Sequence, residues 1–203
     1  MGGISGAPWR RASVLALLAA AAGGACVDVG PLPDDTVPTA DLVVLALAAS
    51  APAPATATFF VPNDRLTVRA IRHPDAFNTL YLELRFPAGA LESLNGTVVA
   101  AGDSVEVTVQ PLAGGYGFTL SPSGLTFSDN APTALLSFGR YADPAGGAAV
   151  FGGTDAYLAA LELWVDVGLD LWAVARGSGP GGVDEVRAFV DAPGVFRLAA
   201  ARE

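Results

Sequence analysis

The sequence predicts an all-β protein, an antiparallel β-sandwich with a C-terminal β extension, preceded by a signal peptide and a Pro/Asp-rich tether. Short segments alternate apolar and polar residues with a period of two, which is typical of half-buried strands. The 203 residues include 24 glycines and 15 prolines, and these punctuate the segments as turn residues do. No long stretch has helical periodicity.

The N-terminus has the three parts of a secretory signal peptide. Arg10 and Arg11 close a positive region, residues 12–22 form an apolar run, and small residues follow up to Ala25. The apolar run is too short to span a bilayer, which takes about 20 residues. We therefore expect residues 1–25 to be a signal peptide.

The only cysteine, Cys26, follows these small residues directly. This arrangement resembles the lipobox of bacterial lipoproteins, although Gly23 stands where that family favours Leu. The resemblance implies cleavage between Ala25 and Cys26, a diacylglycerol on the Cys26 thiol, and attachment to a membrane through that lipid. In Gram-negative lipoproteins, Asp directly after the lipidated cysteine tends to retain the protein in the inner membrane. Val27 stands at this position, so the resemblance favours the outer membrane. The alternative is an ordinary signal peptide cut nearby, with Cys26 a free thiol.

The mature chain divides into a linker over residues 26–41, a β-sandwich over 42–141, and C-terminal strands over 142–203. The C-terminal strands either complete the sandwich or form a small second β unit, and residues 142–155 are expected to be a loop or a boundary. Leu66, Val68 and Ala70 are expected on the buried side of their strand. The predicted strands are 42–48, 57–61, 65–71, 79–86, 104–110, 116–120, 133–138, 158–165, 171–175, 185–190 and 195–200.

Two turn motifs occur in order within the predicted sandwich. The first contains Pro87, Gly89 and Leu91, and the second contains Pro122, Gly124, Leu125 and Phe127. Proline presets φ for a tight corner and glycine accepts positive φ, so the apolar residues after each turn should enter the core. This order is similar to the ZU-five type domain of ankyrins and netrin receptors and to its bacterial relatives. The resemblance implies a sandwich that serves as a recognition or structural module, and the chain lacks the His-Phe-Ser motif of self-cleaving members.

The charge balance narrows the classes of partner. The net charge is −9 and there is no lysine, which disfavours nucleic acids and peripheral binding to anionic lipids. The remaining partners are an envelope protein or a glycan, besides the membrane contacted through lipid on Cys26.

No residue pattern forms a catalytic signature. His73 is the only histidine and there is no G-x-S-x-G elbow, so we expect His73 in a surface loop. One histidine and one cysteine are too few for a zinc site. Asp129–Asn130 and Asp184–Glu185 carry oxygen ligands for calcium, but they lack the spacing of a calcium loop and are read as turns.

Four aromatic residues are candidates for a sugar-binding platform, and core packing is the competing interpretation. They are Trp164, Trp172, Tyr141 and Tyr157. The glycine-rich segments 113–117, 145–153 and 177–182 are expected to be loops, not phosphate cradles, because no lysine or helix accompanies them.

The sequence therefore predicts a non-enzymatic, lipid-anchored envelope protein without metal or cofactor. One alternative is a carbohydrate-active or other hydrolytic envelope enzyme on the same fold. Another is a subunit of a surface assembly, which would expose an apolar patch or an unprotected strand edge.

Overall fold

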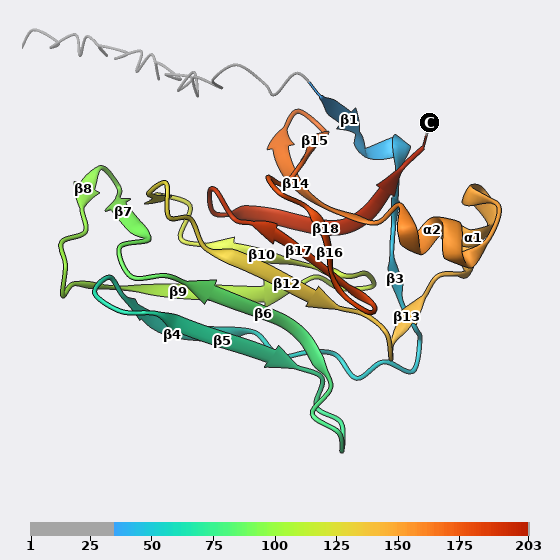
Figure 1. Ribbon diagram of the computed structural model, residues 1–203, viewed down its shortest axis with the longest axis horizontal. Helices are drawn as coiled ribbons and strands as arrows, with labels where there is room; N and C mark the ends of the chain where they lie inside the picture. Colours follow the sequence, from blue (N-terminus) through green and yellow to red (C-terminus); the bar gives the residue numbers. More distant parts are fainter. Residues whose placement is uncertain (1–34, 203) are drawn as a thin grey trace, which may run out of the picture. The chain divides into compact units, whose positions relative to one another are not determined.

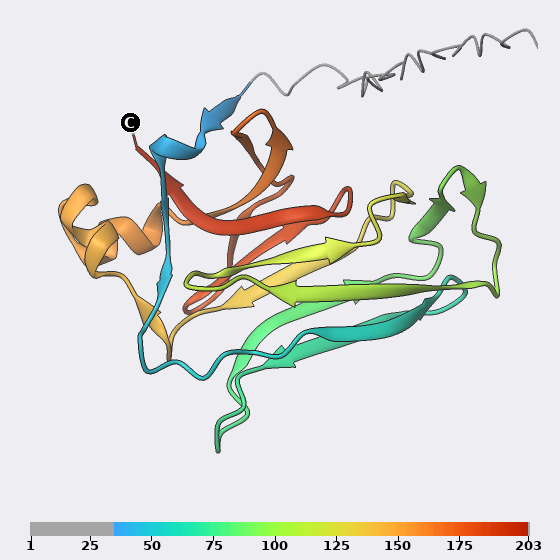
Figure 2. The ribbon, with the colours of Figure 1, turned by 180° about the vertical axis from the view of Figure 1, so that it is seen from behind.

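The computed structural model describes residues 35–202, which belong to one compact unit spanning residues 32–203. Two antiparallel sheets pack face to face in this unit (Figures 1 and 2). Every strand pair is antiparallel, and two short helices are the only α-helices in residues 35–202. The all-β class predicted from the alternating segments is confirmed.

The larger sheet contains eight strands. They are β1 (Thr36–Pro38), β2 (Leu42–Val44), β4 (Ala57–Pro62), β9 (Ser104–Pro111), β10 (Gly117–Ser121), β14 (Glu162–Gly168), β15 (Leu171–Val174) and β18 (Gly194–Ala201). Their order is β1–β15–β14–β18–β10–β9–β4, and β2 pairs with the last residues of β18.

The smaller sheet contains five strands in the order β16–β17–β12–β6–β5. They are β5 (Thr67–Arg72), β6 (Leu80–Phe86), β12 (Thr133–Ser137), β16 (Gly179–Gly182) and β17 (Glu185–Phe189). Two minor sheets complete the fold. They are formed by β7 (Leu91–Leu94), β8 (Thr97–Val98) and β11 (Leu125–Phe127), and by β3 (Ala46–Leu47) with β13 (Ala142–Asp143).

The core lies between the two large sheets, because alternate residues of both sheets point inward. Val105, Val107 and Val109 of β9 belong to the same buried cluster as Leu82 and Leu84 of β6. Within this core, one phenol joins the two sheets. The Tyr81 hydroxyl donates to the Gly117 carbonyl at 2.6 Å and accepts from the Gly117 N–H at 3.0 Å.

The folded chain begins earlier than the linker assignment of residues 26–41 implied. Residues 36–41, which we call the strap, form β1 and a 3-10 helix (Thr39–Asp41), and β1 pairs with β15. Pro38 suggested a tether, but proline is also tolerated at a sheet edge, where its missing N–H is not needed. Residues 1–34, including the expected signal peptide, lie outside the described residues.

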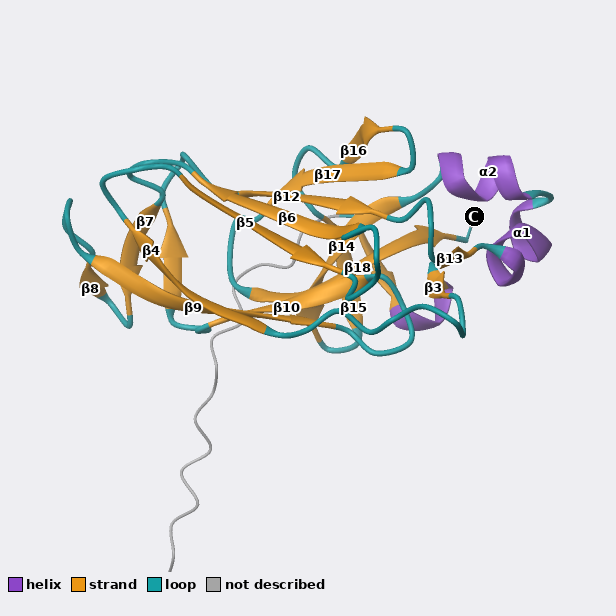
Figure 3. Ribbon diagram, turned by 90° about the horizontal axis from the view of Figure 1, so that it is seen from below, coloured by secondary structure: helices purple, strands orange, loops and turns teal. Residues whose placement is uncertain are grey.

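The glycine-rich stretch 145–153, expected to be a loop, forms helix α1 (Ala145–Phe151). Helix α2 (Thr154–Ala159) follows it and includes the first residues of the strand predicted over 158–165, which begins only at Glu162. Both helices lie at the opposite end of the sandwich from β7 and β8 (Figure 3). Gly152 ends α1 with a φ of +77°, the left-handed conformation typical of a glycine C-cap. Gly147 is buried against Tyr157, whose ring occupies the space that a Cβ would need. Gly152 therefore ends α1, and Gly147 allows close packing against Tyr157 of α2.

The side-chain orientation predicted for the 65–71 strand is wrong. Leu66 and Val68 are 54% and 45% exposed, whereas Ile71 is buried. Arg69, two residues before Ile71, is exposed, and its guanidinium lies 5.5 Å from the centre of the Phe59 ring on β4. Alternation alone does not tell which face of an edge strand is buried, because both faces of β5 mix apolar and polar residues.

The C-terminal strands are integrated into both large sheets. Strand β18 pairs with β10, β14 and β2, and β17 pairs with β12. Strand β3 pairs with β13, so the first strands of the unit contact the last third of the chain. No boundary at residue 141 separates two β units in this arrangement.

We expect the isolated fragment 42–141 to lack cooperative folding. Without residues 142–203, β10 and β2 lose β18, and β12 loses β17. Near-UV circular dichroism and urea titration test this, with the fragment 35–203 as the control that should unfold in one transition. A cooperative transition in the 42–141 fragment would contradict the prediction.

Candidate functional site

The two turn motifs recognised in the sequence meet at one end of the sandwich. The first connects β6 to β7, the second connects β10 to β11, and β7 pairs with β11. Leu91, Leu125 and Phe127 are buried there. The order of motifs along the chain thus corresponds to a contact in space.

The glycines of the two motifs serve different purposes. Gly89 has a φ of +73°, which glycine adopts without steric cost. Gly124 does not adopt a left-handed conformation, contrary to expectation. A Cβ on Gly124 would overlap the Asn95 side chain, and the Asn95 N–H donates to the Gly124 carbonyl at 2.8 Å. Gly124 is therefore explained by close approach of the β7–β8 hairpin.

A buried asparagine, Asn63, organises this end. Its Nδ2 donates to the carbonyls of Leu91 and Val99 at 2.9 and 2.8 Å, and its Oδ1 accepts from the Leu91 N–H at 3.0 Å. Its backbone N–H donates to the Asp103 carbonyl, and its own carbonyl accepts from the Gly89 N–H. The side chain thus connects Leu91 to Val99, and the backbone of the same residue adds Gly89 and Asp103. The sequence gives no signal for this role, since Asn beside Asp suggests only a turn.

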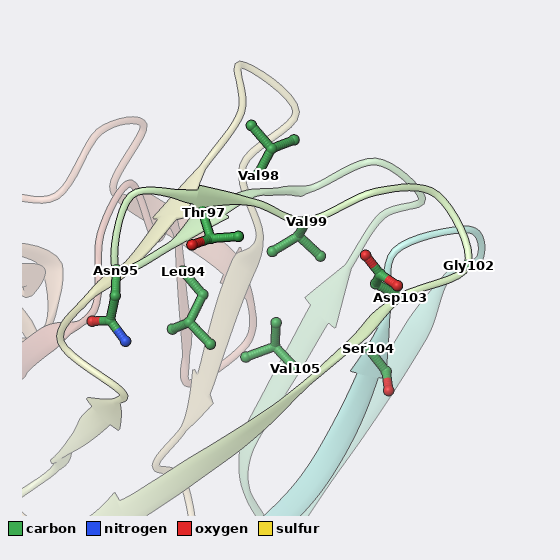
Figure 4. Close-up of a pocket in the computed structure, with 9 residues that line it drawn as sticks. All are labelled: Leu94, Asn95, Thr97, Val98, Val99, Gly102, Asp103, Ser104 and Val105. Carbon is green, nitrogen blue, oxygen red and sulfur yellow. The ribbon is translucent and has the colours of Figure 1, made fainter.

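An open hollow of about 650 Å³ lies between the β7–β8 hairpin and the start of β9. Leu94, Val99 and Val105 point into it, whereas Val98 points away (Figure 4) and is 76% exposed. The other lining residues are Asn95, Thr97, Gly102, Asp103 and Ser104. The hollow therefore offers an apolar floor with a rim of amide, hydroxyl and carboxylate groups.

The hollow offers few groups for acid–base chemistry. Asp103 is the one titratable residue among those lining it. Its Oδ2 accepts from the Ala100 N–H at 3.0 Å, so the carboxylate holds the turn that precedes β9. General acid–base catalysis needs a positioned proton donor or acceptor close to the substrate, and this carboxylate is already engaged in the turn.

His73 is buried, and its predicted place in a surface loop is wrong. Its exposed fraction is 1%. The Nδ1 atom lies 2.7 Å from the Pro52 carbonyl, and because a carbonyl only accepts, Nδ1 carries the proton. The ring packs against Tyr81 and Tyr141 with centroid distances of 5.4 and 4.6 Å. Nε2 is the one buried side-chain polar atom of residues 35–202 without a hydrogen-bond partner.

Asp75 shapes the loop that follows His73. Its carboxylate accepts from the Thr79 hydroxyl and N–H, the Tyr141 hydroxyl and the Phe77 N–H. The Thr79 hydroxyl is the main reason why the pKa of Asp75 lies well below its usual value, and the other donors act in the same direction, whereas burial opposes them. The carboxylate is therefore an ionised acceptor that orders residues 73–79.

Three buried tyrosines belong to the main core cluster, and their hydroxyl groups stay protonated near neutral pH. Burial raises the pKa of Tyr81 and of Tyr157 to about 12, and burial also raises the pKa of Tyr116. Tyr157 donates its hydroxyl to the Val43 carbonyl at 3.1 Å. Its role is to connect the helical end to the strands beside it.

Trp164 and Trp172 are buried, but they do not lie between the two sheets. They form a second apolar cluster with Leu42 and Ala199, separate from the main core. Trp164 donates its indole N–H to the Ala199 carbonyl at 3.0 Å, and Trp172 donates to the Thr39 hydroxyl at 2.7 Å. In this conformation neither ring offers an exposed platform for a sugar.

The remaining candidates lie in turns or outside the described residues. Asn130 donates to the Ala88 carbonyl and so supports the first motif turn, while Asp184 adopts a φ of +56° before β17. Within residues 35–202, no group of three or more His, Cys, Asp and Glu side chains is placed to hold a metal ion. Ala25 and Cys26 belong to the part of the chain that is not described.

Comparison with known proteins yields no family for this chain. No protein-family model matches it, and no curated protein or solved structure is significantly similar to it. None of the helices formed by residues 35–202 is long and apolar enough to cross a membrane.

Replacing Asn63 with alanine should lower the free energy of unfolding by about 3 kcal/mol, since three buried backbone groups would each lose a partner at about 1 kcal/mol or more. Urea titration measures the change. Asn130→Ala is the matched control, because Asn130 makes one exposed hydrogen bond and should cost about 0.5 kcal/mol. Equal effects of the two substitutions would contradict the role assigned to Asn63.

Asp75→Asn should lower the free energy of unfolding at neutral pH. It should also make that free energy fall less steeply as the pH is lowered. A carboxylate with a depressed folded-state pKa stabilises the fold above its unfolded-state pKa of about 3.9, and that stability is lost as pH falls toward the folded-state pKa. Thermal unfolding between pH 7 and pH 2 tests this. Thr79→Val, which removes the strongest donor, should give a smaller effect of the same sign. An unchanged profile in both variants would refute the assignment.

Proposed function

We propose that this protein is a non-enzymatic, lipid-anchored module of the bacterial cell envelope, placed in the outer membrane. The observation that carries the proposal is Cys26, the only cysteine, directly after a signal-peptide-like segment ending in small residues. Acyl chains on this thiol would bind a bilayer through roughly 0.8 kcal/mol per buried methylene. Val27 after the cysteine supports the outer rather than the inner membrane.

The distance from the proposed anchor to the folded unit fits this function. Nine residues, 27–35, separate Cys26 from the first strand residue Thr36. Nine residues span at most about 30 Å when fully extended. The unit would therefore be held close to the membrane, with the strap as the first folded element after the anchor.

The meeting of the two turn motifs supports an immunoglobulin-like or ZU-five-like sandwich. In this interpretation, the Pro87 and Pro122 turns correspond to turns of ZU-five type domains, and they bring β7 beside β11. A module of this kind would act in recognition or as a structural element. The hollow beside the β7–β8 hairpin is its candidate binding surface, and an envelope protein or a glycan is the ligand we propose.

Two observations favour this function over a hydrolytic enzyme. His73 is buried and hydrogen-bonded to Pro52, which leaves it poorly placed to activate a serine. The indole rings of Trp164 and Trp172 are covered, which weakens the case for a sugar platform.

A subunit of a surface assembly is a second candidate. Edge strands β4 and β5 carry the exposed apolar side chains of Phe60 and Val68, and the exposed Leu66 directly precedes β5. Unpaired strand edges with apolar side chains are typical sites of association. Analytical ultracentrifugation of the lipid-free protein would reveal self-association that the anchored-monomer proposal does not require.

Mass spectrometry of the mature N-terminus tests the anchor. We expect an acylated Cys26 as the first residue, and we expect Cys26→Ser to release the protein from the membrane fraction. The fold should be unaffected in the variant, which circular dichroism can verify. An unmodified thiol, or cleavage at another position, would mean a soluble secreted protein and would refute the proposed anchor.

A further inference from the structure

The strap contacts Trp172 and packs against the tryptophan cluster, although none of its own residues is buried. Residues 36–41 are exposed or partly exposed throughout, whereas Trp164 and Trp172 beneath the N-terminal segment are almost fully shielded. Val37 pairs with Trp172 in the β1–β15 ladder and packs against the tryptophan cluster. A segment with little burial of its own therefore contributes to the shielding of the Trp172 ring and of the cluster to which it belongs.

The strap is attached at a small number of points. Strand β1 pairs with β15 over three residues. Thr39 donates its N–H and its hydroxyl to the Asp170 carbonyl at 3.0 and 3.3 Å, and it accepts the indole N–H of Trp172. At the other end, the Arg202 N–H donates to the Asp41 carbonyl at 2.8 Å. Short terminal segments with few buried contacts open at a lower free energy than core strands.

The turn that receives the strap is itself unusual. Leu169 and Asp170 form the two-residue connection between β14 and β15, with φ values of +56° and +62°. Asn-Gly or Asp-Gly is preferred in such hairpin turns, and leucine is disfavoured at positive φ. Leu169 is also 75% exposed. The attachment point of the strap is therefore not optimised for stability.

The cluster beneath the strap is separate from the main core. The main cluster lies between the two large sheets, whereas Leu42, Trp164, Trp172 and Ala199 form their own group. Strand β2 pairs with β18 through residues 42–44, which follow the strap. Apart from the β1–β15 ladder, neither the pairing of the larger sheet nor the main core cluster involves residues 36–41.

We propose that the strap is a releasable cover that opens while the sandwich remains folded, exposing the edge of β15 and the Trp172 ring. The opening depends only on the contacts described above. Its regulation by the membrane rests on the proposed function, because any displacement of the unit away from an anchor at Cys26 would act first on the strap.

The two indole N–H groups allow a direct test. Trp9 lies in the expected signal peptide, so a full chain with Trp9→Phe and Cys26→Ser retains only Trp164 and Trp172. Hydrogen exchange followed by NMR compares the Trp172 indole N–H, held by the strap, with the Leu198 amide of the core. We expect the Trp172 indole N–H and the Thr39 amide N–H to exchange faster than the Leu198 amide N–H. The exchange rates of the first two should depend little on denaturant concentration.

Substitutions in the strap should change the exchange of the Trp172 indole selectively. Thr39→Val removes both hydrogen bonds of the Thr39 hydroxyl, including the acceptor of the Trp172 indole, and should increase the exchange rate of that indole at least about fivefold, while the exchange of the Leu198 amide is unchanged. Val37→Ala is a second variant that loosens the strap without removing a polar group. Thr58→Val is the matched control, since Thr58 bonds Thr108 on β4 and β9, away from the strap.

Exchange of the Trp172 indole and the Thr39 amide at the same rate and with the same denaturant dependence as Leu198 would overturn the proposal. The lipid-free chain is used throughout. A negative result would therefore refute the opening of the strap but not the proposed anchor at Cys26. Absence of acylation at Cys26 would refute the anchor but not the opening of the strap.

Discussion

The last strand of the chain, β18, is the element on which the larger sheet depends. It pairs with β14 on one side and with β10 and then β2 on the other. Its side chains Phe196, Leu198 and Ala200 also belong to the main core. Because central strands contribute ladder bonds on both sides and apolar surface to the interior, the sheet is incomplete until residue 201 is in place. Contacts between the first and last strands make the fold rich in long-range pairing, which is associated with slow folding.

The candidate binding end depends on a different interaction, the buried amide of Asn63. Burial of an amide is unfavourable unless its hydrogen bonds are made, and here each polar atom of the side chain has a backbone partner. The β7–β8 hairpin is a short element with an exposed tip, and its strand β7 pairs with β11. The asparagine, with Gly124 beneath Asn95, gives this hairpin a fixed place beside the sheets.

Most of the strands could be predicted because their alternation is strong. The segments around Val105, Leu82 and Phe196 have their apolar residues two apart, and a one-residue shift would expose them. Other features depend on partners distant in the sequence. The glycines of α1 suggest a loop until the Tyr157 ring that packs against Gly147 is known.

The same limit applies to the candidate site. Pro87, Gly89 and Pro122 were recognisable as turn residues, and the apolar positions that follow them were correctly expected in the core. Asn63 was not recognisable, because nothing local distinguishes a buried asparagine from one in an exposed turn. His73 is buried by Pro52 and Tyr141, which lie 21 and 68 residues away, and no local pattern reports such contacts.

The position of Arg69 on the edge strand β5 has a consequence for molecules crowded on a surface. The anchor proposed for Cys26 would confine copies of the protein to two dimensions, where collisions between sheet edges are frequent. A partner strand that approached β5 would meet the exposed guanidinium of Arg69 beside the Phe59 ring, and a charged side chain on an edge strand is a known obstacle to edge-to-edge pairing. On a crowded membrane the arginine would thus discourage the growth of a continuous intermolecular sheet.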